Sequence, residues 1–269
     1  MATPTNKILQ LPFPEENAKE LLQGLVRNGI TNKFAQAAIL AVSSKETGLV
    51  PKNENLNYSK ERLPEVWGVF SDTAKSVATG TGKYHFNSLA ASVEHNPEKI
   101  AAIVYGGKHG NNTTGDGFKY RGRAYNGVTF RNQYLLYGNK LGIDFVAQPD
   151  LINVLHNASD VAALYFLQTF IDNKSLHLSR YGVDNVNGFR DLDTAVESIA
   201  NANAGMYSSR TGNIYLEGLT RAKSYAPEFA RFIGKVKTSG TGGGAGTGNT
   251  NLHVLIIAAV TFGLFKTFS

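Results

Sequence analysis

Apolar residues recur at helical spacing along most of the first 232 residues, and this pattern restricts the chain to a mainly helical fold. The clearest stretch is residues 14–29, where apolar side chains share one face, a proline opens the first turn and a glycine follows the last. Residues 160–171 are apolar nearly all round, which is typical of a buried central helix. Further helices are expected at residues 31–47, 63–70, 88–104, 129–141, 150–173, 192–202 and 211–232.

A glycine-rich stretch lies between these helical segments. Six glycines fall between residues 106 and 122, interleaved with asparagine and threonine, which suits tight turns. At its end, aromatic Phe118 and Tyr120 alternate with basic Lys119, Arg121 and Arg123. This alternation predicts a short hairpin strand with an aromatic side and a basic side. Such a wall suits a sugar-binding cleft, because aromatic faces cover sugar C–H groups while polar groups meet hydroxyls.

Glu46 is the first of two glutamates that stand eight residues apart. It falls in the last turn of a helix that follows Thr31-Asn32, which are good N-cap residues, and stops at Gly48. The negative end of the helix dipole disfavours a carboxylate there, and neighbouring apolar side chains would add desolvation. Glu46 is therefore the better candidate for a protonated acid.

The second glutamate, Glu54, opens a polar loop. Its neighbours can hydrogen-bond a carboxylate and keep it charged: Asn53, Asn55, Asn57 and Tyr58. One protonated and one ionised carboxyl are what direct cleavage of a glycosidic bond needs, since one protonates the leaving oxygen and the other activates water on the opposite face. The pair predicts acid/base chemistry on a sugar.

Two longer blocks resemble one family. Residues 45–59, ending in Glu-Asn-Leu-Asn-Tyr-Ser, are similar to the start of the catalytic core in the phage and bacterial branch of glycoside hydrolase family 19. Residues 105–134 resemble the family's second signature, in which a Gly-Asp-Gly turn leads into Tyr-Arg-Gly-Arg and then Thr-x-Arg-x-x-Tyr. Residues 198–205 loosely resemble its late Asn-Gly-Gly loop. The likeness spans roughly residues 33–225. It implies a mainly α, two-lobed lysozyme-like fold with a small β-hairpin near the cleft.

The resemblance also implies roles for individual residues. Glu46 would be the general acid, Glu54 the base that activates water, and Thr129 the hydroxyl residue that helps to hold that water. The substrate-binding candidates are Tyr58, Tyr120, Arg123, Asn201 and Asn203, and either asparagine can match the family's late asparagine.

Three residues depart from the family pattern. Lys45 stands where many members have histidine, Ala124 replaces a glycine, and Gly127 replaces a glutamine. A lysine beside the acid would favour the charged carboxylate unless its side chain points away. Gly127 removes a polar contact to substrate, so these positions bear on the sugar that is bound and on the rate.

Composition narrows the chemistry. With no cysteine, disulfides and thiolate sites are excluded, and the six histidines lack His-Glu-x-x-His spacing. We therefore expect neither a metal site nor a cofactor. The net charge of +6 suits a polyanion such as a cell-wall polymer, and no nucleic-acid-binding module is recognisable. Nucleic acid is not expected as a partner.

The C-terminal region differs from the rest. We expect a catalytic domain at residues 1–237, a flexible glycine-rich linker at 238–250 and a hydrophobic tail at 251–269. The tail is borderline for a bilayer span, which needs about 17–25 residues, so it could anchor the chain in a membrane, dock on a partner protein or pack on its own domain. Membrane association through the tail is the preferred prediction, at a virion or host membrane, and no secretory signal is expected at the N-terminus.

These observations predict a peptidoglycan-cleaving glycosidase, a muramidase-type lysin that acts with inversion in phage or bacterial cell-wall lysis or penetration. Its expected partner is bacterial cell-wall glycan. A chitinase is the enzymatic alternative. A non-catalytic, membrane-tethered glycan-binding or structural virion protein is the alternative from another class.

Overall fold

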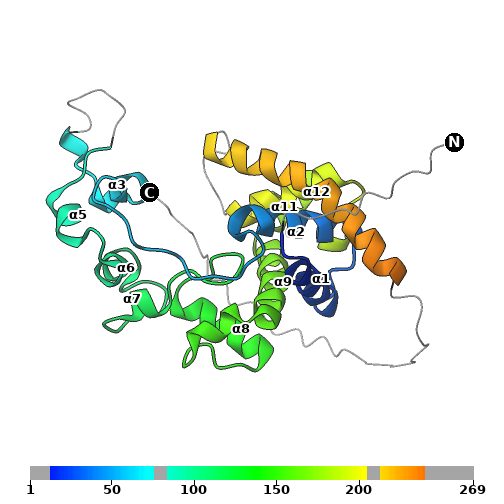
Figure 1. Cartoon of the computed structure of the whole chain (residues 1–269), viewed down its shortest axis with the longest axis horizontal. Helices are drawn as coiled ribbons and strands as arrows, with labels where there is room; N and C mark the ends of the chain where they lie inside the picture. The colour runs from blue at the N-terminus through cyan, green and yellow to red at the C-terminus, as the bar shows by residue number, and fades with distance from the viewer. Residues whose placement is uncertain (1–12, 76–83, 205–212, 240–269) are drawn as a thin grey trace. The chain divides into compact units, whose positions relative to one another are not determined.

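The computed structural model describes residues 13–75, 84–204 and 213–239, and these residues are mainly helical (Figure 1). This confirms the predicted fold class. The elements are α1 (Glu15–Arg27), α2 (Lys33–Thr47), α3 (Leu63–Val66), η1 (Gly68–Phe70), α5 (Ser88–Val93), α6 (Pro97–Tyr105), α7 (Asp116–Lys119), α8 (Arg131–Leu141), η2 (Pro149–Asn153), α9 (Leu155–Asp172), α10 (Lys174–His177), η3 (Ser179–Tyr181), η4 (Val186–Gly188), α11 (Leu192–Ala204) and α12 (Asn213–Ser239).

The expected β-hairpin is not found. Within the described ranges, β-pairing outside named strands is limited to two isolated antiparallel bridges, one between Ser71 and Phe86 and one between Arg123 and Val128. The residues read as an aromatic and basic strand instead begin in helix α7. A short helix starts here because the Asp116 carboxylate accepts a hydrogen bond from the Thr113 N–H at 2.9 Å, which favours a turn over an extended strand.

The described residues divide into two compact units. The first, here called the glutamate unit, holds residues 13–29 and the described residues of 43–166; the second, the C-terminal unit, holds residues 30–42 and the described residues from 167 onward. Both glutamates of the predicted pair lie in the glutamate unit.

Helix α2 begins and ends where the sequence predicts. The side-chain oxygen of Asn32 accepts hydrogen bonds from the N–H groups of Phe34 at 2.9 Å and Ala35 at 3.0 Å, which caps the first turn. Gly48 follows the last residue with φ +68°, a left-handed conformation that favours glycine. Glu46 therefore lies in the last turn of α2, as predicted.

Two predicted helices are interrupted. Residues 63–70 form α3 and η1, separated by Trp67 in an extended conformation with φ −137° and ψ 121°. Residues 88–104 form α5 and α6, because Pro97 disfavours a helical conformation at the preceding residue. The side chain of that residue, Asn96, instead caps α6 by accepting from the Lys99 N–H.

A single hydrophobic cluster holds together the middle of the glutamate unit. It combines buried side chains of α3, η1, α5 and α6 with one residue of the preceding loop: Leu56, Leu63, Trp67, Phe70, Ala90, Val93, Ile100, Ala101, Val104 and Tyr105. This cluster anchors the loop that carries Glu54, because Leu56 is fully buried in it.

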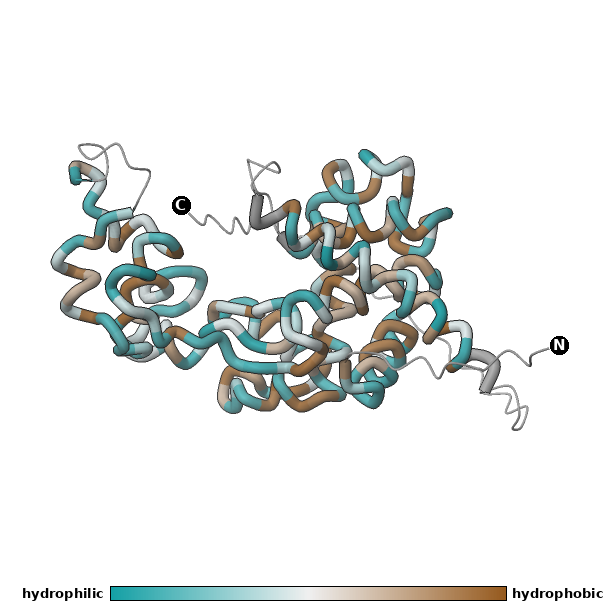
Figure 2. The backbone as a smooth tube through the Cα atoms, turned by 45° about the horizontal axis from the view of Figure 1, so that its top comes forward, coloured by the Kyte–Doolittle hydropathy of each residue, from teal (hydrophilic) through white to brown (hydrophobic). Residues whose placement is uncertain are grey.

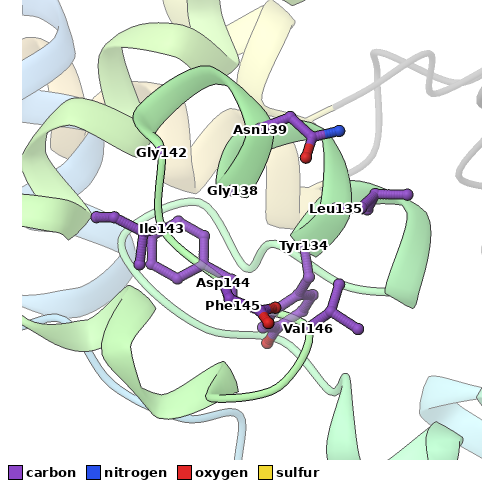
Figure 3. Close-up of a pocket in the computed structure, with 9 residues that line it drawn as sticks. All are labelled: Tyr134, Leu135, Gly138, Asn139, Gly142, Ile143, Asp144, Phe145 and Val146. Carbon is purple, nitrogen blue, oxygen red and sulfur yellow. The ribbon is translucent and has the colours of Figure 1, made fainter.

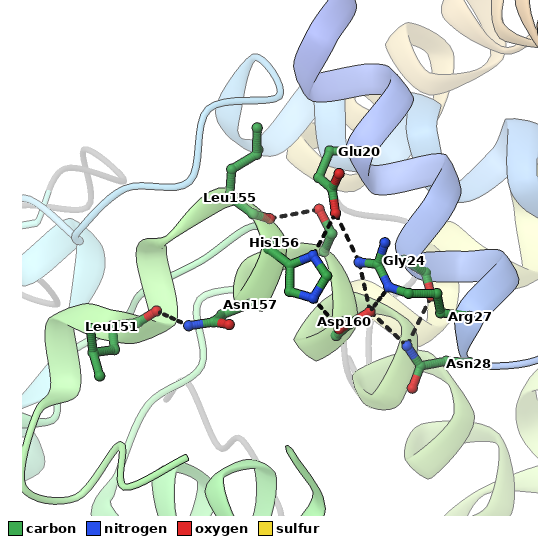
Figure 4. Close-up of polar contacts among 10 residues, drawn as sticks. Glu20, Gly24, Arg27, Asn28, Leu151, Leu155, His156, Asn157 and Asp160 are labelled. Carbon is green, nitrogen blue, oxygen red and sulfur yellow. Dashed lines mark hydrogen bonds and ion pairs between the residues drawn. The ribbon is translucent and has the colours of Figure 1, made fainter. Parts of the chain in front are cut away.

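Helix α1 packs on the start of α9 through Gly24, where an added Cβ would lie 2.7 Å from the Ser159 backbone. Figure 4 shows the polar contacts beside this packing. Arg27 donates to Glu20 at 2.8 Å and to Asp160 at 3.1 Å. The predicted central helix is thus buried on one side rather than all round, since Phe166 and Phe170 are buried whereas Ile171 near its end is 71% exposed.

In the C-terminal unit, α11 packs against α12 (Figure 1). Helix α12 continues to Ser239, two residues past the predicted end of the catalytic domain. The remainder of the predicted linker and the tail at residues 251–269 lie outside the described residues. The three-part domain organisation therefore stays a prediction.

The predicted membrane association requires a correction. None of the described helices combines the length and the apolar character that crossing a membrane requires. Figure 2 shows hydrophilic and hydrophobic residues interleaved along the described helices. The preferred localisation, membrane association through the tail, is therefore not supported.

Candidate active site

The two signature blocks meet at Glu54 and Gly122. The Glu54 N–H donates to the Gly122 carbonyl at 2.7 Å, and the Gly122 N–H donates to Oε2 of Glu54 at 3.2 Å. These reciprocal bonds join residues 68 positions apart. The carboxylate is therefore held by the backbone of the second block.

Tyr105 supplies the other contact to this carboxylate. Its hydroxyl donates at 2.8 Å to Oε1 and at 2.9 Å to Oε2 of Glu54. Burial raises the pKa of Tyr105 well above its ordinary value, and the negative charge of Glu54 raises it further, so the hydroxyl remains a donor. The sequence offered one signal for this residue, since Tyr105 opens the second block, yet no role was predicted for it.

The asparagines expected to hold Glu54 bond elsewhere. Asn53 accepts from Asn153 at 2.7 Å, Asn55 accepts from the Asn57 N–H at 2.9 Å, and the Asn57 side chain lies 2.9 Å from Nδ1 of His95. These bonds stabilise the loop itself rather than the charge on Glu54.

Tyr58 is half-buried beside the same carboxylate. Its ring meets Trp67 edge-on, with 5.3 Å between ring centroids. Burial raises the pKa of Tyr58, and the negative charge of Glu54 adds to that rise. Tyr58 thus belongs to the electrostatic surroundings of Glu54.

Thr129 borders Gly122 from another side. A Cβ on Gly122 would lie 3.2 Å from Oε2 of Glu54 and 3.6 Å from Oγ1 of Thr129, so both oxygens face one small region. The Thr129 hydroxyl donates to the Gly127 carbonyl at 2.7 Å. Because that bond uses its proton, the oxygen presents lone pairs that can accept a hydrogen bond from water.

The next residue, Phe130, has an unusual backbone conformation. Its φ is +71° with ψ 140°, a region that non-glycine residues rarely adopt. Its N–H donates to the Tyr120 carbonyl at 2.8 Å, and its ring packs edge-on against Tyr105 at 5.5 Å. Strain of this kind persists where surrounding contacts fix the chain, and it lies here directly after Thr129.

Glu46 is paired with its neighbour. Nζ of Lys45 lies 2.9 Å from Oε1 of Glu46, so the lysine does not point away from the predicted acid. Of the two apolar neighbours, Leu49 is buried but Val50 is 45% exposed, and the side chain of Glu46 is itself 36% exposed. Glu46 is therefore more exposed to solvent than the sequence predicts.

Tyr120 and Arg123 lie in the interior, each 2% exposed. The Tyr120 hydroxyl donates to the Val146 carbonyl at 3.1 Å. Arg123 donates to Asp150 at 2.9 Å and to the Tyr134 hydroxyl at 2.8 Å. Both residues, which the sequence predicts to bind substrate, thus use their polar groups to stabilise the loop between α7 and α8.

Asn201 and Asn203 lie in α11, in the C-terminal unit. Asn201 is buried and donates to the Tyr181 hydroxyl at 3.3 Å. Of the predicted residues, the structure therefore places Glu54 and Thr129 beside Gly122, and Tyr58 lies near the Glu54 carboxylate.

A pocket of about 640 Å³ opens elsewhere in the glutamate unit, beside α8 (Figure 3). It is lined by Tyr134, Leu135, Gly138, Asn139, Gly142, Ile143, Asp144, Phe145 and Val146. No predicted site residue is among them. Within residues 13–75, 84–204 and 213–239, no group of histidine and carboxylate side chains could hold a metal ion.

No family model matches the chain. Over 120 residues it is 36% identical to a "Glycosyl hydrolase family 19 domain-containing protein" of Haemophilus influenzae. The match covers 43% of this chain and 53% of the relative, so the chain spans about half the length of the curated relative it matches. At the level of the family, this similarity supports a relation to glycosyl hydrolase family 19.

Proposed function

We propose that this chain is a glycoside hydrolase that cuts the glycan strands of peptidoglycan by direct displacement, with inversion at the anomeric carbon. The observation that carries the proposal is the Glu54 carboxylate, held by the Tyr105 hydroxyl and the Gly122 N–H and bordered by the Thr129 hydroxyl. The family name of the Haemophilus influenzae relative supports the glycosidase class.

The proposed reaction is a single displacement. Glu46 gives its proton to the glycosidic oxygen while the bond between that oxygen and the anomeric carbon breaks. A water molecule donates one hydrogen bond to the Thr129 hydroxyl oxygen, attacks the opposite face of the sugar and gives its other proton to Glu54. Glu46 ends ionised, Glu54 ends protonated, and exchange with solvent restores both.

The Lys45 ion pair has to open in this scheme, because Glu46 acts as an acid only when it carries a proton. Both side chains are partly exposed, 28% for Lys45 and 36% for Glu46. Exposed pairs of this kind contribute about 0–1 kcal/mol, so substrate binding can displace the lysine at small cost.

Charge favours peptidoglycan over chitin. The chain carries a net charge of +6, which attracts the anionic polymers of a bacterial wall more than it attracts neutral chitin. We therefore propose a role in cell-wall lysis or penetration, with chitin cleavage as the second candidate.

A turbidity assay on purified cell walls tests the proposal. The full chain should clear the walls, and Glu46→Gln and Glu54→Gln should each lower the rate by roughly 10²- to 10⁴-fold, the usual contribution of acid/base catalysis. Glu61→Gln, at an exposed glutamate of the same unit, is the matched control and should clear walls normally. Activity that survives both catalytic changes would rule out the glutamate mechanism.

Mass spectrometry of the fragments then separates the candidates. Cleaved sugar linkages with intact peptides support a glycosidase, whereas cleaved peptides contradict it. Faster release of fragments from chitin than from walls would favour a chitinase. Walls that are bound but never cut would indicate a non-catalytic glycan-binding protein.

A further inference from the structure

Tyr105 donates from its hydroxyl to both oxygens of Glu54, at 2.8 and 2.9 Å. It closes helix α6 and is 6% exposed. No role in catalysis follows for it from the two signature blocks. Its geometry nevertheless connects it to the base more closely than any residue predicted from the sequence.

The ring of Tyr105 is fixed on two sides. Trp67 meets it edge-on with 6.5 Å between centroids, and Phe130 meets it edge-on at 5.5 Å. Its backbone is fixed as well, because its carbonyl accepts from the Asn111 side chain at 3.0 Å. A ring held in this way leaves the hydroxyl little freedom to turn away from Glu54.

The hydroxyl is a donor to the Glu54 carboxylate. Burial raises the pKa of Tyr105, and the negative charge of Glu54 raises it further, so it keeps its proton through the neutral and mildly alkaline range. A donor to a carboxylate favours the ionised form. A carboxylate has about four lone-pair positions, so the bonds from Tyr105 and from Gly122 leave it able to accept a proton from water.

We propose that Tyr105 is a positioning residue for the general base: its hydroxyl fixes the orientation of the Glu54 carboxylate and favours its ionised form. This inference rests on the proposed function, in which Glu54 activates water. Tyr105 keeps its proton throughout and transfers nothing.

Tyr105→Phe in the full chain tests this inference, since it removes the hydroxyl and keeps the ring. We expect kcat for cell-wall cleavage to fall about 10- to 100-fold, a part of the 10²–10⁴ that acid/base catalysis supplies, with little change in KM. The acidic limb of the pH profile of kcat/KM should move to higher pH, because the ionised base has lost a donor. A purely structural role would lower the amount of folded protein without moving that limb.

Tyr125→Phe is the matched control. Tyr125 is 1% exposed and lies in the same unit, and its hydroxyl is not a partner of Glu54 in the described structure. It should leave the acidic limb in place. The inference would be overturned if the acidic limb of the kcat/KM profile moved equally in both variants, or if it did not move in Tyr105→Phe.

A second measurement separates this inference from the proposed function. The titration of the Glu54 side chain, followed by carbon NMR in the wild type and in Tyr105→Phe, needs no activity. A midpoint that moves to higher pH in the variant supports the positioning role even if no glycan is cut, in which case the proposed function alone fails. An unchanged midpoint would overturn the positioning role even in an active enzyme.

Discussion

Gly122 is the residue at which the two signature blocks touch, and its lack of a side chain has a geometric reason. A Cβ there would lie 3.2 Å from both Cβ and Oε2 of Glu54. We predict that Gly122→Ala displaces the carboxylate and lowers kcat roughly 10- to 100-fold, because small misplacements of a reacting group are costly. The free energy of unfolding should fall by only about 1 kcal/mol, since a glutamate side chain can move aside. Cell-wall cleavage and urea unfolding measure the two effects.

Gly234→Ala is the control for that change. Nothing lies within 4 Å of an added Cβ at Gly234, which stands inside helix α12. It should leave kcat unchanged and raise the free energy of unfolding by about 0.5–1 kcal/mol, as alanine does in a helix. If Gly122→Ala keeps full activity, the carboxylate is not where catalysis needs it.

Lys45 should influence the predicted acid through its ion pair with Glu46 at 2.9 Å. A positive neighbour favours the ionised carboxylate, so Lys45→Gln should favour the protonated acid. We predict that the alkaline limb of the pH profile of kcat/KM moves to higher pH, while the free energy of unfolding changes by less than about 1 kcal/mol.

Lys52→Gln removes an exposed lysine from the following loop and gives the comparison for Lys45→Gln. It should not move the alkaline limb. The same profile in all three proteins would mean that the Lys45 ion pair has no influence on the predicted acid.

At the scale of residues, the sequence predicted the site only in part. Thr129 and Glu54 could be brought together because both stand in recognisable blocks, and the structure places both beside Gly122. No role follows from the sequence for Tyr105, although it opens the second block, because its bond to Glu54 depends on how α6 packs. The alternation of aromatic and basic residues predicts Tyr120 on the wall of a cleft, yet its side chain, directly after α7, is buried.

At the scale of elements, periodicity predicted the long helices well because their stability comes from one apolar face. It missed the interruptions, which depend on single residues. His95 adopts φ +55° between α5 and α6, and Trp67 is extended between α3 and η1. In both places the local backbone conformation of one or two residues overrides the periodic signal.

The junction of α10 and α11 should make stability depend on pH. His177 is buried, and burial lowers its pKa below the ordinary value. The folded state therefore favours the neutral ring, and its contribution to stability is present above the ordinary pKa of about 6.5 and is lost as the pH falls below it. We predict that the free energy of unfolding, measured with urea, falls between about pH 7.5 and 5.5. In His177→Leu this fall should be smaller by up to about 1 kcal/mol.

His156→Leu serves as the comparison for His177→Leu. The ring of His156 is 59% exposed and lies 3.0 Å from Glu20, so its removal should not reduce the acid-side decline. An equal decline in wild type and His177→Leu would contradict the assignment to His177.

At the scale of the whole molecule, composition and periodicity were enough for the mainly helical class. The division into two compact units follows from packing between distant segments, and the sequence alone gives no boundary for it. The glutamate unit joins residues 13–29 to residues 43–166, an arrangement that no continuous domain boundary describes.

The central claim is that Glu54 activates water for a one-step displacement on a glycan. Proton NMR of the first sugar product released from soluble β-linked peptidoglycan strands tests it most directly. We predict that the α-anomer forms first, because water attacks the face opposite the leaving group, and that Glu54→Gln abolishes its release. A first product with the β-anomer, or release of the α-anomer by Glu54→Gln at the wild-type rate, would contradict it.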